Sequence, residues 1–254
     1  MRFSIVTPSL NQGRYLAECL DSVVSQDIET EHWVIDGGSM DETLSILRSR
    51  PDARWISEPD RGQSDAINKG LQRVTGDILG YLCADDFLEP GVLSRIAEIF
   101  AANPAADFVY GDGYFLESDS GWKRLKRAGA FSIERLRRGN FLLQPAVFWR
   151  RRVYERHGGF DTSLQYCMDH EYWLRTCGDT VWHYFAEPLA SCRLHADAKT
   201  SRALALAWAE AVGMQARYGI HGRPAWDALW MRVAGARYYT LKRRVFALIG
   251  RLRK

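Results

Sequence analysis

Residues 3–36 read FSIVTPSLNQGRYLAECLDSVVSQDIETEHWVID, and this stretch predicts the fold class. It begins with the apolar run FSIVTP, continues with a helix-period segment from Arg14 to Ser25, and ends in a second strand-like run, HWVID. The same alternation continues through RWIS (54–57), DILGYLC (77–83) and ADFVYGD (106–112). Alternating strands and helices indicate βαβ units on a mainly parallel sheet flanked by helices, which is an α/β fold.

The composition narrows the class of protein. The chain has 254 residues, 46% hydrophobic and 26% charged, so it can bury a full core and is neither disordered nor fibrous. Its five cysteines are scattered without a CxxC pair, so neither a disulfide framework nor a zinc site is indicated and a reducing cytoplasm is expected. The sequence shows no export signal and no apolar stretch near the roughly 20 residues of a transmembrane helix, so we expect a soluble or peripheral protein.

The pattern changes along the chain in two places. After about residue 112 an aromatic and basic stretch precedes an extended segment, LLQPAVFWRR, and a helix-like DHEYWLRTC. We therefore predict one domain, residues 1–202, with a nucleotide-facing half (1–112) and an acceptor-facing half (113–202). Residues 203–254 have helical periodicity and form a predicted C-terminal extension.

The end of this extension is basic and amphipathic. From Ala228 onward it has eight Lys or Arg residues and no acidic residue, although the formal net charge of the chain is only +3. One helical face carries an apolar stripe, as expected for binding at an anionic membrane surface. Packing of this helix on the domain or in a dimer explains the stripe equally well. The stripe consists of Trp230, Ala234, Tyr238, Leu241, Val245, Leu248 and Leu252.

Polar and acidic residues follow each predicted strand, where ligands of parallel sheets bind. Asp85 and Asp86 offer hard oxygen ligands for Mg²⁺ or Mn²⁺, and an acidic pair at the N-terminus of the next helix is the structural alternative. Asp36 precedes two glycines and can accept hydrogen bonds from a nucleobase or ribose, or serve only as a turn residue. The set is Thr7, Pro8, Ser9, Asp36, Glu58, Asp60, Asp85, Asp86 and Asp112.

Six segments in fixed order resemble the family 2 glycosyltransferases of the GT-A fold. The resemblance covers about residues 1–200 and implies a Rossmann-like nucleotide-binding sheet, a divalent metal and a single-displacement, inverting mechanism. The segments are TPSLNQGRYLAECLDSVVSQ (7–26), VIDGGSMDET (34–43), SEPDRGQSDAINKGL (57–71), GDILGYLCADD (76–86), GGFDTSLQYCMDHEYWLR (158–175) and RLHADAKT (193–200).

The resemblance also assigns roles by position. Asp169 matches the catalytic base, with Glu171 two residues on, and a cap for the helix beginning at His170 is the alternative role of Asp169. The metal-site residues implied are Asp85, Asp86 and His195, although a lone histidine is more often structural. The donor-binding residues implied are Thr7, Pro8, Ser9, Asp36, Asp65, Lys69, Asp85 and Arg193.

Two positions depart from the family pattern. Gly37 stands where many members have a second Asp, and Cys83 stands where many have Asp or Asn before the Asp-Asp pair, which bears on metal geometry. The QxxRW signature of processive synthases is absent, so we expect one sugar to be added per encounter. Basic clusters at 123–127, 135–138 and 150–152 suit either a phosphate-bearing acceptor or a solvated surface. Aromatic side chains of the acceptor-facing half suit a platform for a sugar ring, although most are expected in the core. They are Tyr114, Trp122, Trp149, Tyr166 and Trp173.

The sequence therefore predicts a metal-dependent inverting glycosyltransferase of the hexosyltransferase type. It is expected to use a nucleotide-diphosphate sugar, a UDP-sugar by resemblance, and to act on a glycan or lipid-linked glycan at the inner face of the plasma membrane. A catalytically silent nucleotide-sugar-binding scaffold is disfavoured because Asp36, Asp85, Asp86 and Asp169 are all retained. A sugar nucleotidyltransferase would need a Gly-rich basic loop near the N-terminus, and SLNQGRY offers little of that kind.

Overall fold

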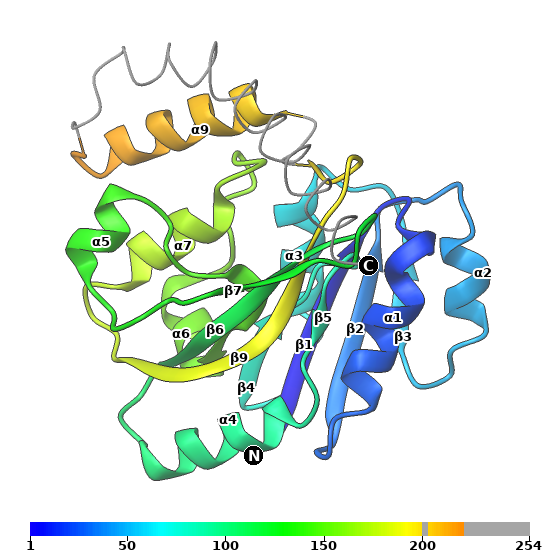
Figure 1. The fold of residues 1–254 in the computed structure, drawn as a ribbon, viewed down its shortest axis with the longest axis horizontal. Coiled ribbons are helices and arrows are strands. Elements are labelled where there is room, and N and C mark those ends of the chain that lie inside the picture. The colour runs from blue at the N-terminus through cyan, green and yellow to red at the C-terminus, as the bar shows by residue number, and fades with distance from the viewer. Residues whose placement is uncertain (200–202, 221–254) are drawn as a thin grey trace.

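The computed structural model describes residues 1–199 and 203–220, and in this part of the chain one nine-stranded sheet runs through the molecule (Figure 1). Its strand order is β3-β2-β1-β4-β8-β6-β9-β5, with β7 paired to β6. The strands are β1 (Phe3–Ser9), β2 (Thr30–Asp36), β3 (Arg54–Ser57), β4 (Ile78–Tyr81), β5 (Phe87–Leu88), β6 (Phe108–Glu117), β7 (Lys123–Lys126), β8 (Val147–Arg150) and β9 (Trp182–Leu194).

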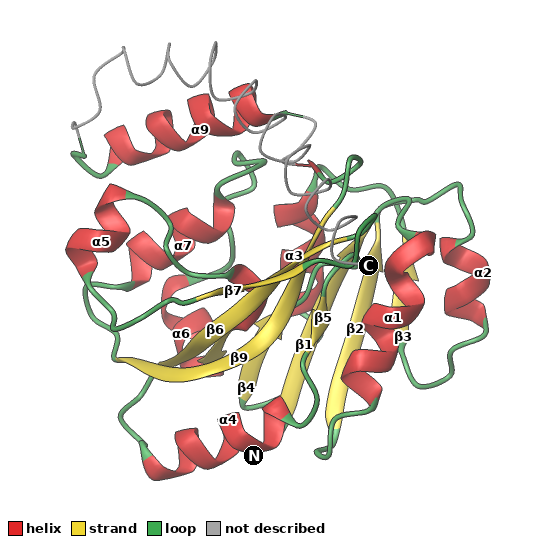
Figure 2. Cartoon of the chain, viewed as in Figure 1, coloured by secondary structure: helices red, strands yellow, loops and turns green. Residues whose placement is uncertain are grey.

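Helices cover the sheet, with α1 and α2 beside its β1–β2–β3 side and α5, α6 and α7 beside its β6 side (Figure 2). The predicted helix from Arg14 to Ser25 and the helix-like DHEYWLRTC correspond to observed helices, with ends that differ by a few residues. The helices are α1 (Gly13–Val24), α2 (Thr43–Arg48), α3 (Gln63–Leu71), α4 (Val92–Ala102), α5 (Ile133–Arg138), the 3₁₀ turn η1 (Gln144–Ala146), α6 (Arg151–His157), α7 (Met168–Thr176) and α9 (Leu204–Arg217).

The first half of the sheet is parallel. β1 pairs in parallel with both β2 and β4, and β2 with β3. Every residue of β1 is buried, which explains why its sequence is apolar without strict alternation. Because these strands point the same way, their carboxyl ends lie along one edge of the sheet and bring the polar residues after them together.

The second half continues the same sheet and adds antiparallel strands. β8 runs antiparallel to both β4 and β6, so it joins the two halves, while β9 runs parallel to β6. The predicted α/β class with a mainly parallel sheet is confirmed, and the sequence did not signal the antiparallel insertions. β6 passes through residue 112 without a break, so the two predicted halves share a continuous sheet; the domain boundaries stay a prediction.

The acceptor-facing half is built around buried aromatic rings. Trp149 and Trp173 have no exposed surface, and Trp182 stacks with ring centroids 3.9 Å apart on Phe108, which comes from the nucleotide-facing half. Such contacts remove large apolar areas from water. The expectation that these aromatic residues are mostly core is confirmed for Trp149 and Trp173, whereas Tyr166 lines a cleft described below.

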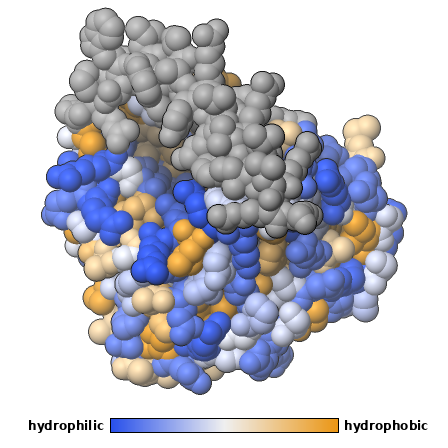
Figure 3. Space-filling view, in the orientation of Figure 1, coloured by the Kyte–Doolittle hydropathy of each residue, from blue (hydrophilic) through white to orange (hydrophobic). Residues whose placement is uncertain are grey.

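None of the helices in residues 1–199 and 203–220 is long and apolar enough to cross a membrane. On the face drawn in Figure 3, hydrophobic residues are scattered in small patches among polar ones. The helix α9 rests on the acceptor-facing half, where Met214 is buried in the core. The predicted basic amphipathic helix from Trp230 to Leu252 lies outside the described residues.

Candidate active site

A cleft of about 1120 Å³ opens at the carboxyl ends of β1 and β4. Side chains from both halves of the chain line it. Several predicted donor-binding residues and the predicted catalytic base therefore share one cavity. Among the predicted site residues, those that line the cleft are Pro8, Ser9, Asp85, Asp86, Asp169 and Arg193.

The end of β1 supplies the floor on the nucleotide-facing side. Pro8 and Ser9 line the cleft, whereas Thr7 is fully buried behind them and its hydroxyl lies 2.8 Å from His32 Nε2. Burial lowers the pKa of His32 to about 4, so the ring is neutral at pH 7. Thr7 therefore supports the floor of the cleft from below and does not face it.

Asp36 is fully buried, and the chain itself surrounds its carboxylate with donors. Oδ2 accepts hydrogen bonds from the backbone N–H groups of Gly38 (3.1 Å) and Ser39 (3.0 Å) and from the Ser57 hydroxyl (2.6 Å), and the Ser39 hydroxyl donates to Oδ1. In this conformation the carboxylate of Asp36 stabilises the loop after β2, which is the turn role that the sequence left open. Its contact with a nucleobase stays a prediction.

Gly37, the first departure from the family pattern, makes room for Asp60. A Cβ built on Gly37 would lie 2.5 Å from Asp60 Oδ2, so any side chain there would displace that carboxylate. Asp60 lines the cleft and its Oδ1 accepts a hydrogen bond from the N–H of Gly62 at 2.8 Å. An acidic group therefore remains near the position of the missing second Asp, provided from a different loop.

Asp65 and Lys69 lie on α3, outside the side chains that line the cleft. Asp65 forms an ion pair with Arg61 at 3.0 Å, and the hydrogen bond from Arg61 holds the pKa of Asp65 below its usual value. Lys69 pairs with Glu58 at 2.9 Å. These contacts stabilise the segment before and along α3, and a direct contact of either residue with the donor stays a prediction.

Asp85 and Asp86 follow β4 and face the cleft together with Cys83. One ligand atom from each of these three residues lies within 4.8 Å of the other two. Burial and the negative charge of Asp85 raise the pKa of Asp86 well above its usual range. Neighbouring positive groups do not fully balance the negative charge of these two carboxylates. The residues present therefore suit a divalent ion such as Mg²⁺ or Mn²⁺. Cys83 adds a softer atom at the edge of this site and does not displace the carboxylates.

The segment RLH (193–195), at the end of β9, contacts the acidic pair. The backbone N–H of Arg193 donates to Asp86 Oδ1 at 2.8 Å, and its guanidinium donates to the backbone oxygen of Asp85 at 2.9 Å. His195 Nε2 lies 2.9 Å from Asp85 Oδ2. Among the described residues its Nδ1 is buried and has no hydrogen-bond partner. Both residues thus contact the predicted metal motif, and whether His195 ligates a metal stays a prediction.

Asp169 lies in the first turn of α7, across the cleft from the nucleotide-facing half. Its Oδ2 accepts a hydrogen bond from the Asn140 amide at 2.8 Å, and its Oδ1 accepts one from the His170 N–H at 2.8 Å. Burial raises the pKa of Asp169 above its usual value, although these donors and the His170 ring oppose that shift. A carboxylate whose pKa is raised toward neutrality is suited to accept a proton. Glu171, by contrast, pairs with Arg175 at 2.9 Å and points away from this chemistry.

Several lining residues were not foreseen. Asn140 orients Asp169, Gln144 donates to the Tyr81 carbonyl at 2.6 Å, and the Cys192 thiol donates to Asp86. Asn140 lies in a loop without a distinctive pattern, so the sequence offered no signal for it. Cys192 directly precedes Arg193 in a segment that was noted, and that proximity was the available signal. Lys126, from the predicted cluster at 123–127, also lines the cleft.

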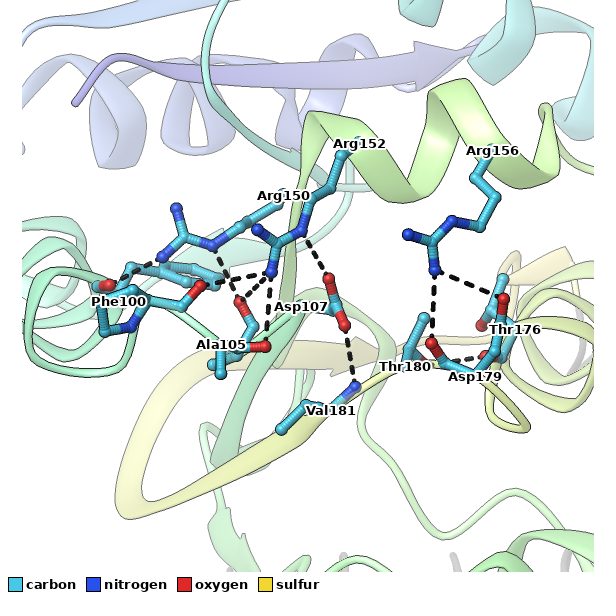
Figure 4. Close-up of polar contacts among 12 residues, drawn as sticks. Phe100, Ala105, Asp107, Arg150, Arg152, Arg156, Thr176, Asp179, Thr180 and Val181 are labelled. Atoms are coloured by element: carbon cyan, nitrogen blue, oxygen red, sulfur yellow. Dashed lines mark hydrogen bonds and ion pairs between the residues drawn. The ribbon is translucent and has the colours of Figure 1, made fainter.

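The arginines at 150–152 lie at the opposite end of the sheet. Arg150 pairs with Ile78, the first residue of β4, and its guanidinium donates to the carbonyl of Phe100 at 2.7 Å (Figure 4). Arg152 Nε donates to Asp107 Oδ1 at 2.7 Å. Of the two interpretations of this cluster, phosphate binding is disfavoured because these guanidinium groups bind the chain's own carbonyl and carboxylate oxygens.

Comparison with known proteins identifies the lineage. The model of the family described as Glycosyl transferase family 2 matches residues 4–159. This range includes the carboxyl ends of β1, β2 and β4, the acidic pair and β8. The chain belongs to glycosyltransferase family 2.

Relatives of this family 2 glycosyltransferase include a biosynthetic glycosyltransferase and a polysaccharide synthase. A PGL/p-HBAD biosynthesis glycosyltransferase from Mycobacterium tuberculosis is 33% identical over 180 residues, which cover 68% of each chain. Chondroitin synthase from Escherichia coli is 27% identical over 184 residues, which cover 68% of this chain and 26% of that one.

Solved structures share the fold of this family 2 glycosyltransferase. S. aureus TarS 1–349 in complex with UDP-GlcNAc has a TM-score of 0.68 at 16% identity, covering 80% of this chain and 61% of that one. The mannosyltransferase PcManGT from Pyrobaculum calidifontis in complex with GDP-Man and Mn²⁺ has a TM-score of 0.63 at 21% identity, covering 91% and 70%. At these identities the likeness establishes the GT-A fold, and the sequence-based expectation of that fold is confirmed.

Proposed function

We propose that this chain transfers a single sugar from a nucleotide-diphosphate sugar, in the first place a UDP-sugar, to an acceptor hydroxyl with inversion at the anomeric carbon. The observation that carries the proposal is that Asp169 and the Asp85–Asp86 pair, from different halves of the chain, line one cleft. Displacement at an anomeric carbon needs a group that takes a proton from the nucleophile and a separate site for the leaving group.

Asp169 is the proposed general base. The acceptor hydroxyl forms its bond to the anomeric carbon while its proton passes to Asp169, and the bond from that carbon to the diphosphate oxygen breaks. The Asn140 amide and the His170 N–H fix the carboxylate for this transfer. Inversion requires attack from the α7 side and departure toward Asp85 and Asp86 to lie on opposite faces of the bound sugar.

Asp85 and Asp86 are the proposed ligands of a divalent ion. A bound Mg²⁺ or Mn²⁺ would supply Lewis-acid stabilisation of the departing diphosphate. The guanidinium of Arg193, which bonds the Asp85 carbonyl and pairs with Glu18, lies beside the same motif. The complex of PcManGT with GDP-Man and Mn²⁺ supports metal use in a protein of this fold.

We propose glycolipid or surface-polysaccharide assembly as the process, at the cytoplasmic face of the membrane. The PGL/p-HBAD biosynthesis relative supports a lipid-linked acceptor, and the complexes of TarS with UDP and UDP-GlcNAc support a UDP-sugar. The basic amphipathic sequence after Ala228 supports contact with an anionic membrane surface.

Titration of the purified chain with UDP-, GDP- and dTDP-sugars tests the proposal, with and without Mn²⁺, by calorimetry and by slow donor hydrolysis. We expect one donor to bind in a metal-dependent way and Asp86→Ala to weaken that binding. Binding of a donor without hydrolysis or transfer would favour a catalytically silent nucleotide-sugar-binding protein, and absence of binding to every donor would favour a scaffold that has lost the donor site. Release of pyrophosphate from a nucleoside triphosphate and a sugar phosphate would favour the nucleotidyltransferase. Detection of the anomeric product by NMR then checks inversion.

A further inference from the structure

The loop before α7 presents three consecutive backbone N–H groups to one carboxylate. Glu210 Oε2 accepts a hydrogen bond from the N–H of Gln165 at 2.7 Å, and Oε1 accepts from those of Tyr166 at 2.6 Å and Cys167 at 2.9 Å. Successive N–H groups that converge in this way form a concave site for an anion. Glu210 lies on α9, outside the region that the family model matches.

This contact holds the N-cap residue of α7, Cys167, and the two residues before it. The side chain of Cys167 makes no capping hydrogen bond, and within the first turn of α7 Asp169 Oδ1 accepts the N–H of His170. Unsatisfied N–H groups at a helix N-terminus are stabilised by a negatively charged group placed there. Glu210 provides that group from a different helix, so the position of α7 depends on α9.

The capped loop is part of the cleft wall. Gln165, Tyr166 and Asp169 line the cleft within one short segment. The Gln165 amide also donates to the carbonyl of Arg61 at 3.1 Å, which joins this loop to the nucleotide-facing half. A shift of the loop would therefore move the proposed base and the wall beside it together.

Other contacts hold α9 in register with the acceptor-facing half. Arg217 pairs with Asp161 at 2.9 Å, and the hydroxyl of Tyr218, which follows α9, donates to Glu171 on α7 at 2.5 Å. In Figure 1, α9 lies beyond α7 on the side away from the sheet. Glu210 is the α9 residue whose carboxylate reaches the backbone next to Asp169.

We propose that Glu210 is a positioning residue for the transfer reaction, which holds the loop 165–167 and thereby sets the place of Asp169 relative to the donor. The kinetic part of this inference rests on the proposed function. It assigns to α9 a direct part in building the acceptor side of the cleft.

Three full-length variants test the proposal: Glu210→Ala, Glu210→Gln, which keeps one amide oxygen as acceptor, and Arg217→Gln, which removes an α9 ion pair without touching the loop. We expect UDP binding by calorimetry to change less than about twofold in all three. Donor hydrolysis, with water in place of the acceptor, should fall about 10- to 100-fold in Glu210→Ala, because displacement of a reacting group by about 1 Å has effects of that size. Glu210→Gln should retain an intermediate rate and Arg217→Gln a nearly unchanged one.

Amide hydrogen exchange of the peptide containing residues 165–167 gives a readout that needs no activity. Exchange should be faster in Glu210→Ala than in Arg217→Gln. Equal exchange in these two variants, equal hydrolysis rates, or a parallel loss of UDP binding would each overturn the role of Glu210. If the wild type hydrolyses no donor while exchange still responds to Glu210→Ala, the proposed function fails and the capping of the loop by Glu210 stands.

Discussion

The two ends of the central sheet differ in how their charged groups are paired. At the end opposite the cleft, Asp107 accepts hydrogen bonds from Arg152 at 2.7 Å and from the N–H of Val181 at 2.9 Å, and Arg150 donates to the carbonyl of Ala106 at 2.8 Å (Figure 4). Each charged group there has partners of opposite sign or polarity. These contacts join the segment before β6 to α4, β8 and β9.

At the cleft end, acidic groups are crowded together, and Asp86 is buried beside Asp85. Asp85 lies next to Asp86, whose pKa is raised well above its usual range, and burial also raises the pKa of Asp169. A fold gains nothing from crowding acidic groups in this way. Charged groups paired with partners of opposite sign, as at the matched end around Asp107, stabilise the fold. Carboxylates that lie beside one another without such partners, as at the unmatched cleft end, indicate a site for a cation or a proton, and this distinguishes the two ends.

The largest expected effect comes from Asp169→Asn. An amide of the same shape keeps the contact with Asn140 but cannot take a proton, so transfer should fall by about 10³-fold. Donor affinity should remain, because the nucleotide-facing half is unchanged. Rates from a radiolabelled or NMR transfer assay and a calorimetric donor titration check this, and transfer at the wild-type rate would remove Asp169 from the role of base.

Asp107→Asn tests the matched end. Loss of the charged acceptor leaves Arg152 without its carboxylate partner, and the free energy of unfolding should fall by about 2 kcal/mol. Urea denaturation followed by circular dichroism measures the change, with Asp179→Asn, in an exposed pair with Arg156, as the matched control. A loss of donor binding at unchanged stability would contradict the structural role of this end.

Asp86→Asn tests the unmatched end in the opposite direction. Removal of a charge that is buried beside Asp85 should raise the free energy of unfolding of the metal-free protein by about 1 kcal/mol, while metal-dependent donor binding is lost. Thermal unfolding in EDTA and donor titration with Mn²⁺ give the two readouts. Destabilisation by this variant would show that the acidic pair is a structural feature of the fold.

The same variant has a pH signature. The pKa of Asp86 is higher in the folded than in the unfolded chain, so the folded state binds more protons between those two values. The contribution of Asp86 to stability is therefore lost as pH rises through this window, and it is recovered on acidification. Relative to the wild type, Asp86→Asn should stabilise the protein more at pH 8 than at pH 4, a difference that denaturation at the two pH values measures.

The smallest effect is expected for Arg156→Gln. Its guanidinium lies 3.4 Å from Asp179, and the two side chains are 53% and 52% exposed. Exposed ion pairs contribute little, so the free energy of unfolding should change by less than about 0.5 kcal/mol. A larger loss in urea denaturation would mean that the charge matching of this end extends to its surface.

Much of the nucleotide-facing half could be predicted from the sequence, because its contacts are made close to the strands that carry them. The apolar runs at residues 3–8 and 32–36 correspond to β1 and β2, and the acidic pair after β4 faces the cleft as expected. The helix around Asp169 was also predicted. Hydrophobic periodicity and the residues that follow each strand are local patterns. Because the strands are parallel, their carboxyl ends meet at one edge of the sheet.

Other parts could not be predicted, because they depend on groups far apart in the chain. Thr7 and Asp36 belong to the expected motifs, yet His32 lies beside the hydroxyl of Thr7 and the chain's own donors surround Asp36. The sequence places Arg150 and Arg152 in a basic cluster, and only the antiparallel course of β8 shows that they lie away from the cleft. Residue type alone does not show which partner a charged group meets.

The sequence by itself determined the family, the α/β class and the residue types that the proposed reaction needs, since six ordered motifs and the strand pattern are written in consecutive residues. The tertiary structure decided which of those residues face the cleft, how Asn140 orients Asp169, and how Glu210 reaches the loop before α7. The physical reason is that hydrogen bonds and burial join residues 29 to 45 positions apart in these contacts, and such pairings follow from packing and not from local propensity.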